Sequence, residues 1–266
     1  MLMRSSSVGL NDIIAGIKHF SLIMMLGWQD IRQRYRRSVL GPFWLTLSMG
    51  IMIGTIGVVF SQILSSPIDE FIPFLSAGLI LWGMISSVVT EACTSFIYSE
   101  GVIKQLPLPL SVHMFRMIWR NVIIFGHNIV ILPLVFLVVG KPFSLISLLS
   151  IPGFLLTVIN LGWISFLLGI ICTRYRDFPQ IIGSLLQIIF YLTPIIWMPD
   201  LLPKRAGLYL LDSNPAFHLL EIVRAPLLGH MPTALNWGVT FFLAVAGWLV
   251  TIMFYSRYKH RIAYWL

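Results

Sequence analysis

Long runs of apolar residues alternate with short polar segments along most of the chain. A hydrocarbon core of about 30 Å needs roughly 20 helical residues at a rise of 1.5 Å each. Six windows with few or no charges reach that length: 42–64, 71–90 with a more polar continuation to 98, 113–140, 145–172, 178–197 and 232–255. Since a lone segment in lipid satisfies its backbone hydrogen bonds only as a helix, the pattern predicts an all-α protein with six transmembrane helices.

The segment before the first window has a different pattern. Apolar residues recur there at steps of three and four: Ile13, Ile17, Phe20, Met24, Trp28, Ile31 and Tyr35. One apolar face with polar residues elsewhere predicts an amphipathic helix lying in the membrane interface. Residues 20–26 are apolar nearly all round, so a re-entrant or more deeply buried helix is the alternative.

Composition places the chain in the membrane class, because 58% of its residues are hydrophobic and 11% are charged. Soluble domains carry roughly 25% charged residues. The net charge of +8 does not point to nucleic acid, since basic residues collect in the cytoplasmic loops of membrane proteins. The basic residues that fall on one side of six crossings are Arg32, Arg34, Arg36, Arg37, Lys104, Arg174, Arg176, Arg257, Lys259 and Arg261. Both termini are therefore expected in the cytoplasm.

Residues for catalysis are not clustered in this sequence. The acidic residues are scattered, and the adjacent pair Asp69 and Glu70 falls in a short outer loop. Gly140-Lys141 lacks the remainder of a phosphate-binding loop, and the histidines lack a His-Glu-x-x-His spacing. We expect no catalytic site, metal site or cofactor in this chain. Cys93 and Cys172 lie in apolar surroundings and are expected to be buried thiols rather than a disulfide or a metal pair.

Three stretches carry a resemblance to a known family. They are DIRQRYRRSVLGPFW at 30–44, EGVIKQLPLPLSVHMFR at 100–116, and the pair FYLTPIIWMPDLLP at 190–203 and NPAFHLLEIVRAPLLG at 214–229. In this order and within six spans, they resemble the membrane subunit of an ABC-type polysaccharide exporter, the permease family that moves lipid-linked O-antigen, capsule or teichoic-acid chains. One departure is the segment QLPLPLS after Lys104, whose few charges imply a less polar partner contact.

The resemblance implies a bacterial inner-membrane protein with a defined division of the chain. Residues 1–38 would be a cytoplasmic segment with the interface helix, 39–256 the transmembrane domain, and 257–266 a cytoplasmic tail. A coupling loop would lie at about 99–111, and a re-entrant outer gate segment at about 199–231, between helices five and six. Two copies would form a channel above two separate ATPase subunits, which would bind ATP and Mg²⁺.

The resemblance also implies roles for individual residues. The residues expected to couple to the ATPase are Asp30, Arg34, Arg36, Glu100, Gly101 and Lys104. Channel-lining aromatic residues, suited to stacking on sugar rings, would be Phe43, Trp44, Trp82, Phe190, Tyr191 and Trp197. The outer gate would contain His218, Glu221 and Arg224, with Glu221 and Arg224 spaced to pair along one helix. For the coupling residues, the alternatives are a topology anchor before the first span and an ordinary solvated turn at 99–111. For the aromatic residues, the alternative is an interfacial aromatic belt. For the outer gate, the alternative is an inert outer cap.

The third window carries a basic stripe, because His113, Arg116, Arg120 and His127 share one narrow helical face. A central arginine costs about 2.5–3.5 kcal/mol in lipid, so the two arginines are expected either to snorkel to the inner head groups or to face a polar cavity. Our hypothesis is that the stripe binds the diphosphate of a polyprenyl-linked glycan, since guanidinium groups match phosphate oxygens.

Three other functions remain open from the sequence. A related ABC permease for small molecules or drugs would share the same frame. A membrane-embedded acyl or glycosyl transferase would need a clustered acid or histidine site. An ion-coupled carrier would need a carboxylate within the membrane, for which Glu91, toward the cytoplasmic end of the second span, is the candidate.

Overall fold

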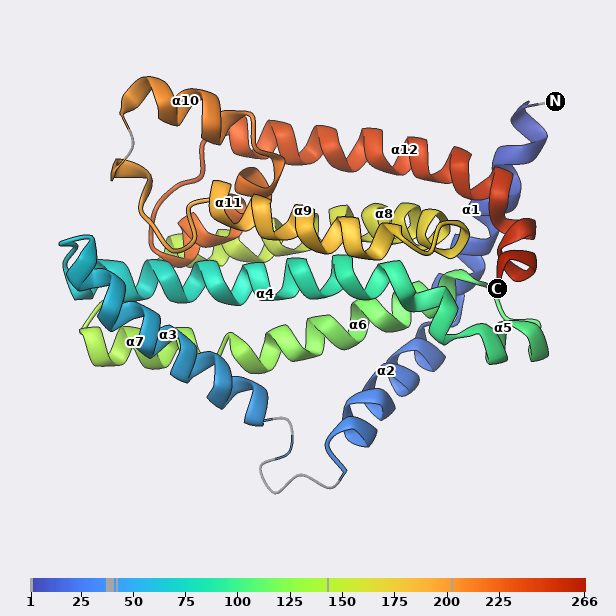
Figure 1. Cartoon of the computed structure of the whole chain (residues 1–266), viewed down its shortest axis with the longest axis horizontal. Helices are drawn as coiled ribbons and strands as arrows, with labels where there is room; N and C mark the ends of the chain where they lie inside the picture. The colour runs from blue at the N-terminus through green and yellow to red at the C-terminus, as the bar shows by residue number, and fades with distance from the viewer. Residues whose placement is uncertain (1, 37–40, 42, 143, 202) are drawn as a thin grey trace.

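The computed structural model describes residues 2–36, 41, 43–142, 144–201 and 203–266. It is an elongated helical bundle, in which the described residues form no strand (Figure 1). In chain order the helices are α1 (Leu2–Lys18), α2 (Phe20–Arg34), α3 (Phe43–Ile63), α4 (Ile68–Tyr98), α5 (Glu100–Gln105), α6 (Ser111–Asn128), α7 (Ile131–Val139), the 3₁₀ helix η1 (Leu145–Leu149), α8 (Ser150–Arg174), α9 (Phe178–Leu192), the 3₁₀ helix η2 (Pro199–Leu201), α10 (Lys204–Asp212), α11 (Pro215–Leu227) and α12 (Ala234–Trp265).

Five predicted spans correspond to helices that are long and apolar enough to cross a membrane. These are α3, α4, α6 continued by α7, η1 continued by α8, and α12. The prediction of an all-α, multi-pass membrane protein is confirmed. Both termini lie at one end of the bundle together with α5, whereas α7, α10 and α11 lie toward the other end (Figure 1).

The window 178–197 does not form one continuous helix. Its helix α9 ends at Leu192 after 15 residues, which is about 22 Å at 1.5 Å per residue. The cause is Pro194, which disfavours helical geometry at the preceding residue, and Thr193 is accordingly extended at φ −90° and ψ 133°. A non-helical segment then leads to η2.

The expected single helix before the first span is broken. Helices α1 and α2 meet at His19 and are bent by 69° between Val8–Lys18 and Phe20–Arg34. Helix α1 is anchored to the end of α12, because Asp12 accepts hydrogen bonds from Tyr255 Oη at 2.6 Å and Lys259 Nζ at 2.7 Å. The bent pair together has the length and composition of one further span. Its position at the membrane surface stays a prediction.

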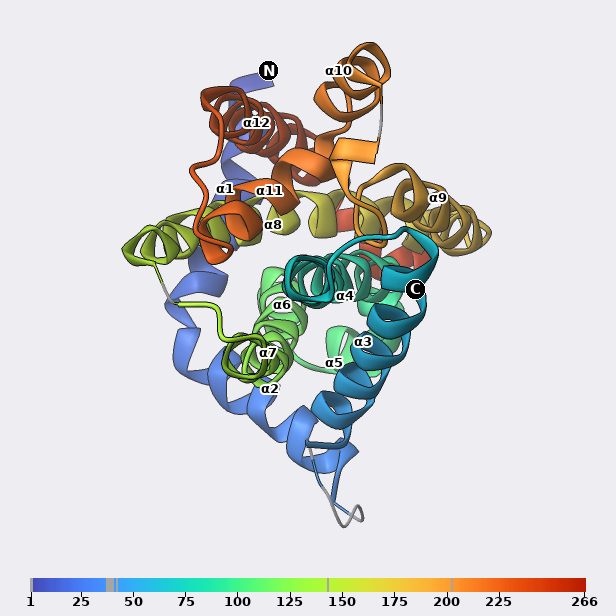
Figure 2. The same cartoon turned by 90° about the vertical axis from the view of Figure 1, so that its left-hand side faces the viewer.

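Helix α4 is the centre of the bundle, with α3, α6, α8 and α9 packed around it (Figure 2). Most of its residues are buried, including Phe71, Leu75, Val88 and Phe96. Behind it, Asn160 of α8 donates to the carbonyl of Thr240 at 3.1 Å. Such bonds supply specific packing between helices where lipid provides no hydrophobic drive for association.

The loop between α4 and α6, where the coupling loop was expected, contains α5. Pro107 and Pro109 follow α5 and keep the two long helices separate. Cys93 and Cys172 are both buried, as expected, and both are free thiols in the structure.

Gly153 allows the backbones of α8 and α11 to touch. A Cβ atom there would lie 2.2 Å from the carbonyl oxygen of Ile222, a backbone atom that cannot rotate away. Gly153→Ala should therefore lower the free energy of unfolding by about 1–3 kcal/mol, the usual cost of overpacking. Chemical unfolding in mixed micelles would measure it. Gly183→Ala is the control, since a Cβ there meets nothing within 4 Å; equal stability of both variants would contradict the prediction.

Candidate functional site: a charged cavity between α2, α4 and α6

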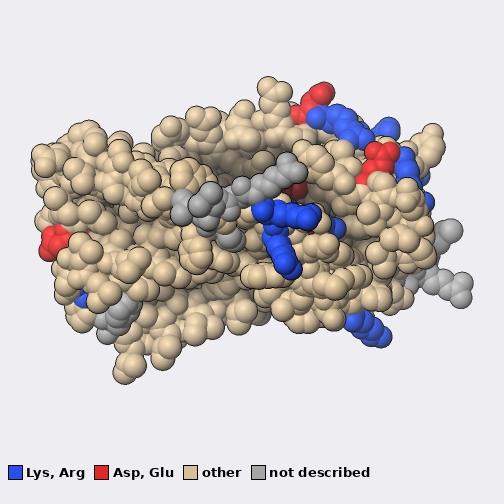
Figure 3. All heavy atoms as spheres, turned by 90° about the horizontal axis from the view of Figure 1, so that it is seen from below, with Lys and Arg blue, Asp and Glu red and all other residues tan. Residues whose placement is uncertain are grey.

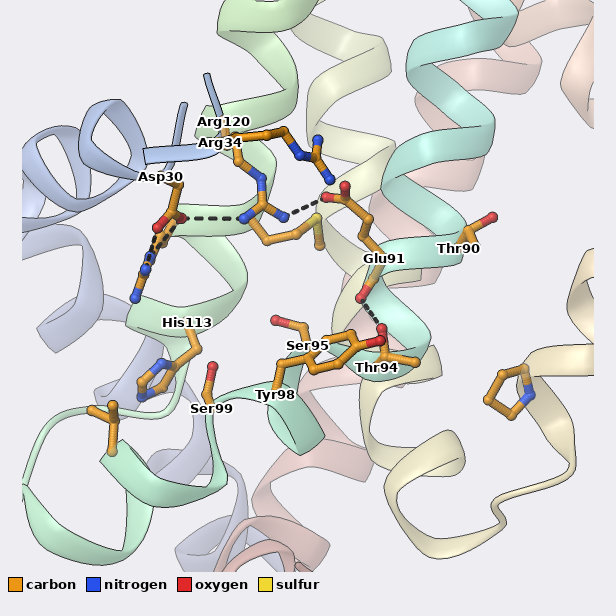
Figure 4. A pocket seen from close by; sticks show the side chains of 14 residues that line it. Asp30, Arg34, Thr90, Glu91, Thr94, Ser95, Tyr98, Ser99, His113 and Arg120 are labelled. Carbon is orange, nitrogen blue, oxygen red and sulfur yellow. Dashed lines mark hydrogen bonds and ion pairs between the residues drawn. The ribbon is translucent and has the colours of Figure 1, made fainter. Parts of the chain in front are cut away.

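Arg116 and Arg120 of α6 form an ion-pair network with carboxylates from two other helices. Arg116 Nε donates to Asp30 Oδ2 at 2.8 Å, and its Nη2 donates to the second oxygen, Oδ1. Arg120 Nη1 reaches the same Asp30 Oδ2 at 3.2 Å, while its Nη2 donates to Glu91 Oε2 at 2.6 Å. Asn121 Nδ2 also donates to that Glu91 oxygen, at 2.7 Å. The network thus links α2, α6 and α4 (Figure 4).

The four charged residues of this network line a cavity of about 700 Å³. The other lining residues are Arg34, Thr90, Thr94, Ser95, Tyr98, Ser99, Val102, His113, Met117 and Pro179. Figure 4 shows side chains from α2, α4 and α6 around this space. The two arginines were expected either to snorkel to the head groups or to face a polar cavity. In the structure they line a polar cavity, and both guanidinium groups contact carboxylates of neighbouring helices.

The charged groups are partly shielded from solvent. The side chain of Asp30 is 12% exposed, and those of Arg116, Arg120 and Glu91 are 30%, 23% and 26% exposed. Their attraction is therefore screened less than that of a surface pair. Three arginines face two carboxylates in the cavity, which leaves one positive charge in excess.

The basic stripe is divided by the fold. His113 lines the same cavity, with both ring nitrogens buried and without a hydrogen-bond partner among the described residues. His127 does not line it; its Nδ1 lies 2.8 Å from the carbonyl oxygen of Ile123, and its ring meets Phe43 edge-on. The structure therefore brings three of the four stripe residues together. Their role as headgroup ligands stays a prediction.

The six residues grouped for coupling lie in different places. The Asp30 carboxylate faces inward onto the arginines. Arg34 and Arg36 are exposed near the end of α2. When the molecule is seen from below, basic side chains form one group at mid-length, and others lie toward the end with the termini (Figure 3). Most of the remaining surface in this view is uncharged.

Helix α5 presents its polar residues at the end of the bundle. Glu100 and Lys104 pair one turn apart at 2.6 Å, and this hydrogen bond together with the ammonium charge lowers the pKa of the Glu100 carboxyl. Gly101 is exposed, and a Cβ there would meet nothing within 4 Å. Their contact with an ATPase stays a prediction.

The aromatic candidates are also divided between surface and core. Trp82 is buried in the core and its ring lies 5.8 Å from that of Phe190. Trp197 Nε1 donates to the carbonyl of Tyr191 at 3.1 Å. The exposed members of the set are Phe43, Trp44 and Tyr191.

The outer segment contains Arg224, the most deeply buried charged side chain among the described residues. Arg224 is 0% exposed; its Nε and Nη2 donate to Glu221 Oε2 at 3.0 and 2.5 Å, and its Nη1 donates to the carbonyl of Pro194 at 2.5 Å. Its guanidinium also lies over the ring of Phe74. His218 is equally buried, with its nitrogens 2.7 Å from Asn236 Oδ1 and 2.9 Å from the carbonyl of Asp212. The predicted pair of Glu221 and Arg224 is confirmed.

The sequence pattern missed the partners that come from other segments of the chain. Asp30 and Glu91 are the carboxylates that neutralise Arg116 and Arg120, and the Pro194 carbonyl is bound by Arg224. Helical spacing identified each arginine, but a partner from another helix leaves no local signal. Among the described residues, no three His, Cys, Asp or Glu side chains are grouped to bind a metal ion.

The sequence matches the ABC-2 type transporter family over residues 21–228. It is 24% identical over 253 residues to the O-antigen export system permease protein RfbA of Klebsiella pneumoniae, covering 92% of this chain and 94% of that protein. A protein of the same name from Myxococcus xanthus is 23% identical over 211 residues, covering 79% and 81%. These matches extend over most of the bundle, including the charged cavity. The chain therefore belongs to the ABC-2 type transporter family and is a transport subunit of the membrane.

Proposed function

We propose that this chain is the channel-forming subunit of an ATP-driven exporter that moves lipid-linked polysaccharide, such as O-antigen, across the bacterial cytoplasmic membrane. The observation that carries the proposal is the cavity in which Arg34, Arg116 and Arg120 gather near α5. Relatives that span nearly the whole chain and are named O-antigen export permeases support this substrate class.

The cavity chemistry suits a diphosphate headgroup. A polyprenyl-linked glycan carries two negative charges on its diphosphate, next to a long apolar tail. Arginine binds phosphate oxygens in bidentate geometry, and the cavity has an excess of positive charge. The hydroxyl groups of Thr90, Thr94 and Ser95 line the same space and can accept or donate to sugar hydroxyls.

The other parts of the proposed transport function would be located on the aromatic surface and at the two ends of the bundle. Two copies would enclose the channel, and the exposed Phe43, Trp44 and Tyr191 would offer flat apolar rings to the passing sugars. Helix α5 and the basic end of α2 would receive the movement of two ATPase subunits, which hold ATP and Mg²⁺. Helices α10 and α11 would form the outer gate, with both termini in the cytoplasm.

A deletion strain tests this function directly. Polyprenyl-linked glycans are extracted and compared with polysaccharide on the cell surface. We expect long lipid-linked polymer to accumulate inside the cell while surface polysaccharide disappears, and the intact gene should reverse both changes. Unchanged surface polysaccharide without an internal pool would contradict polymer export and would favour a small-molecule substrate.

A further inference from the structure

Asp30 occupies the place on α6 that a bound anion would take. Both of its carboxylate oxygens accept from Arg116, and Oδ2 also accepts from Arg120. This is the fork geometry in which a guanidinium binds either a carboxylate or a phosphate. The binding face of the arginines is thus already filled by a side chain of the protein itself.

The two carboxylates of the network are held differently. Glu91 Oε2 accepts from Arg120 and from Asn121, whose Nδ2 also donates to the carbonyl of Met117. For Asp30, the hydrogen bonds among the described side chains come from the two arginines. An anion that took over the arginine contacts would leave Asp30 without these hydrogen bonds, whereas Glu91 would keep the one from Asn121.

Helix α2 contacts α6 through an apolar face and through Asp30. Ile23, Gly27 and Ile31 are its buried residues, and they share a face with Asp30 at steps of three and four. Gly27 brings α2 close to α6, since a Cβ there would lie 2.7 Å from Trp119 Cδ1. Apolar contacts thus hold α2 from Ile23 to Ile31, and the ion pairs of Asp30 add a charged contact with α6 in the last two turns.

We propose that Asp30 is a displaceable internal anion, whose place on Arg116 and Arg120 is taken by the diphosphate of the lipid-linked substrate. Displacement removes the ion pairs that hold the C-terminal turns of α2 on α6, so that loading of the cavity is transmitted to α2. This inference rests on the proposed function, because it takes a diphosphate as the ligand.

Charge balance supports the exchange. With Asp30 in place, Arg116 and Arg120 are balanced by Asp30 and Glu91. Once Asp30 leaves with its turns of α2, which also contain Arg34, the two arginines of α6 face Glu91 alone and one positive charge is uncompensated. A diphosphate diester carries two negative charges, so it takes over the compensation that Asp30 supplied. A ligand shifts such an equilibrium only through its preference for one state, and here the preference is for the state with Asp30 withdrawn.

Hydrogen exchange of α2 tests the inference. The full chain is placed in phosphatidylcholine nanodiscs, with farnesyl diphosphate as the probe and farnesol as the uncharged control. In the wild type, farnesyl diphosphate should raise amide exchange in residues 28–34 by about threefold or more, and farnesol should not. Nanodiscs with phosphatidylglycerol should leave exchange low; release by that lipid alone would overturn the inference, because the site would then respond to bulk phospholipid.

Asp30→Asn supplies the second arm. Removing the competing charge should raise α2 exchange without ligand and tighten farnesyl diphosphate binding by about tenfold, equivalent to 1.4 kcal/mol. Asp177→Asn is the matched control, since Asp177 is exposed and makes no cap hydrogen bond. If farnesyl diphosphate binds to the wild type without changing amide exchange in α2, this inference is overturned while the proposed headgroup site stands. That outcome does not depend on whether Asp30→Asn folds. Absence of diphosphate binding would overturn the proposed headgroup site, and the inference with it.

Discussion

Surface polysaccharide is expected to fall by about tenfold or more when Arg120 is replaced by glutamine, because hydrogen bonds to charged groups contribute about 1.5–3 kcal/mol each. Arg120 contacts Asp30 and Glu91 together, so it both completes the proposed diphosphate site and joins three helices. Surface staining of a complemented deletion strain would measure the effect, with the amount of protein in the membrane determined by immunoblot.

A double variant separates these two roles of Arg120. The double variant Glu91→Gln with Arg120→Gln removes both charges of this ion pair, so that Glu91 is not left as an unpaired carboxylate. If the positive charge serves the substrate, the double variant should export as poorly as Arg120→Gln alone. Recovery of export to the wild-type amount would mean that Arg120 only neutralises Glu91, and the headgroup role would be wrong.

Arg224→Ala should lower the free energy of unfolding by about 3–5 kcal/mol, the usual cost of breaking a buried ion pair by removing one partner. The variant leaves Glu221 without its cation and the carbonyl of Pro194 without its donor. It also opens a space beside Phe74. Denaturation in mixed micelles, followed through the fluorescence of the nine tryptophans, would measure the loss.

Two companion variants test the reason for that loss. Arg257→Ala removes an exposed arginine on α12 and should change stability by less than about 0.5 kcal/mol. Arg224→Met with Glu221→Gln removes both charges and fills part of the space, so it should be clearly more stable than Arg224→Ala. If Arg224→Ala were as stable as Arg257→Ala, the outer segment would not depend on this cluster.

Helix α4 connects the two charged clusters. Glu91 belongs to the inner network, whereas Phe74 stacks on Arg224 in the outer cluster. They are separated by about 25 Å along the helix at 1.5 Å per residue. One continuous, largely buried helix therefore contributes a residue to each cluster.

The local sequence was sufficient to predict the membrane class and most of the helices. Hydropathy marks a lipid-spanning segment by itself, since each helix satisfies its own backbone. Proline and asparagine likewise fixed the start of α11, where Asn214 accepts from the amides of Ala216 and Phe217. The pair of Glu221 and Arg224 was predictable for the same reason, because both residues belong to one helix.

Contacts between distant segments determined the remainder. The bend at His19 follows from the docking of α1 on α12 and of α2 on α6, which no periodicity within residues 13–35 records. Asp30 was expected to couple to the ATPase, as the resemblance implied, yet its carboxylate meets Arg116, 86 residues further along the chain. Local pattern shows that a charge in lipid needs a partner, but only the packing of α2, α4 and α6 selects Asp30 and Glu91, because ion pairing acts through space and not along the sequence.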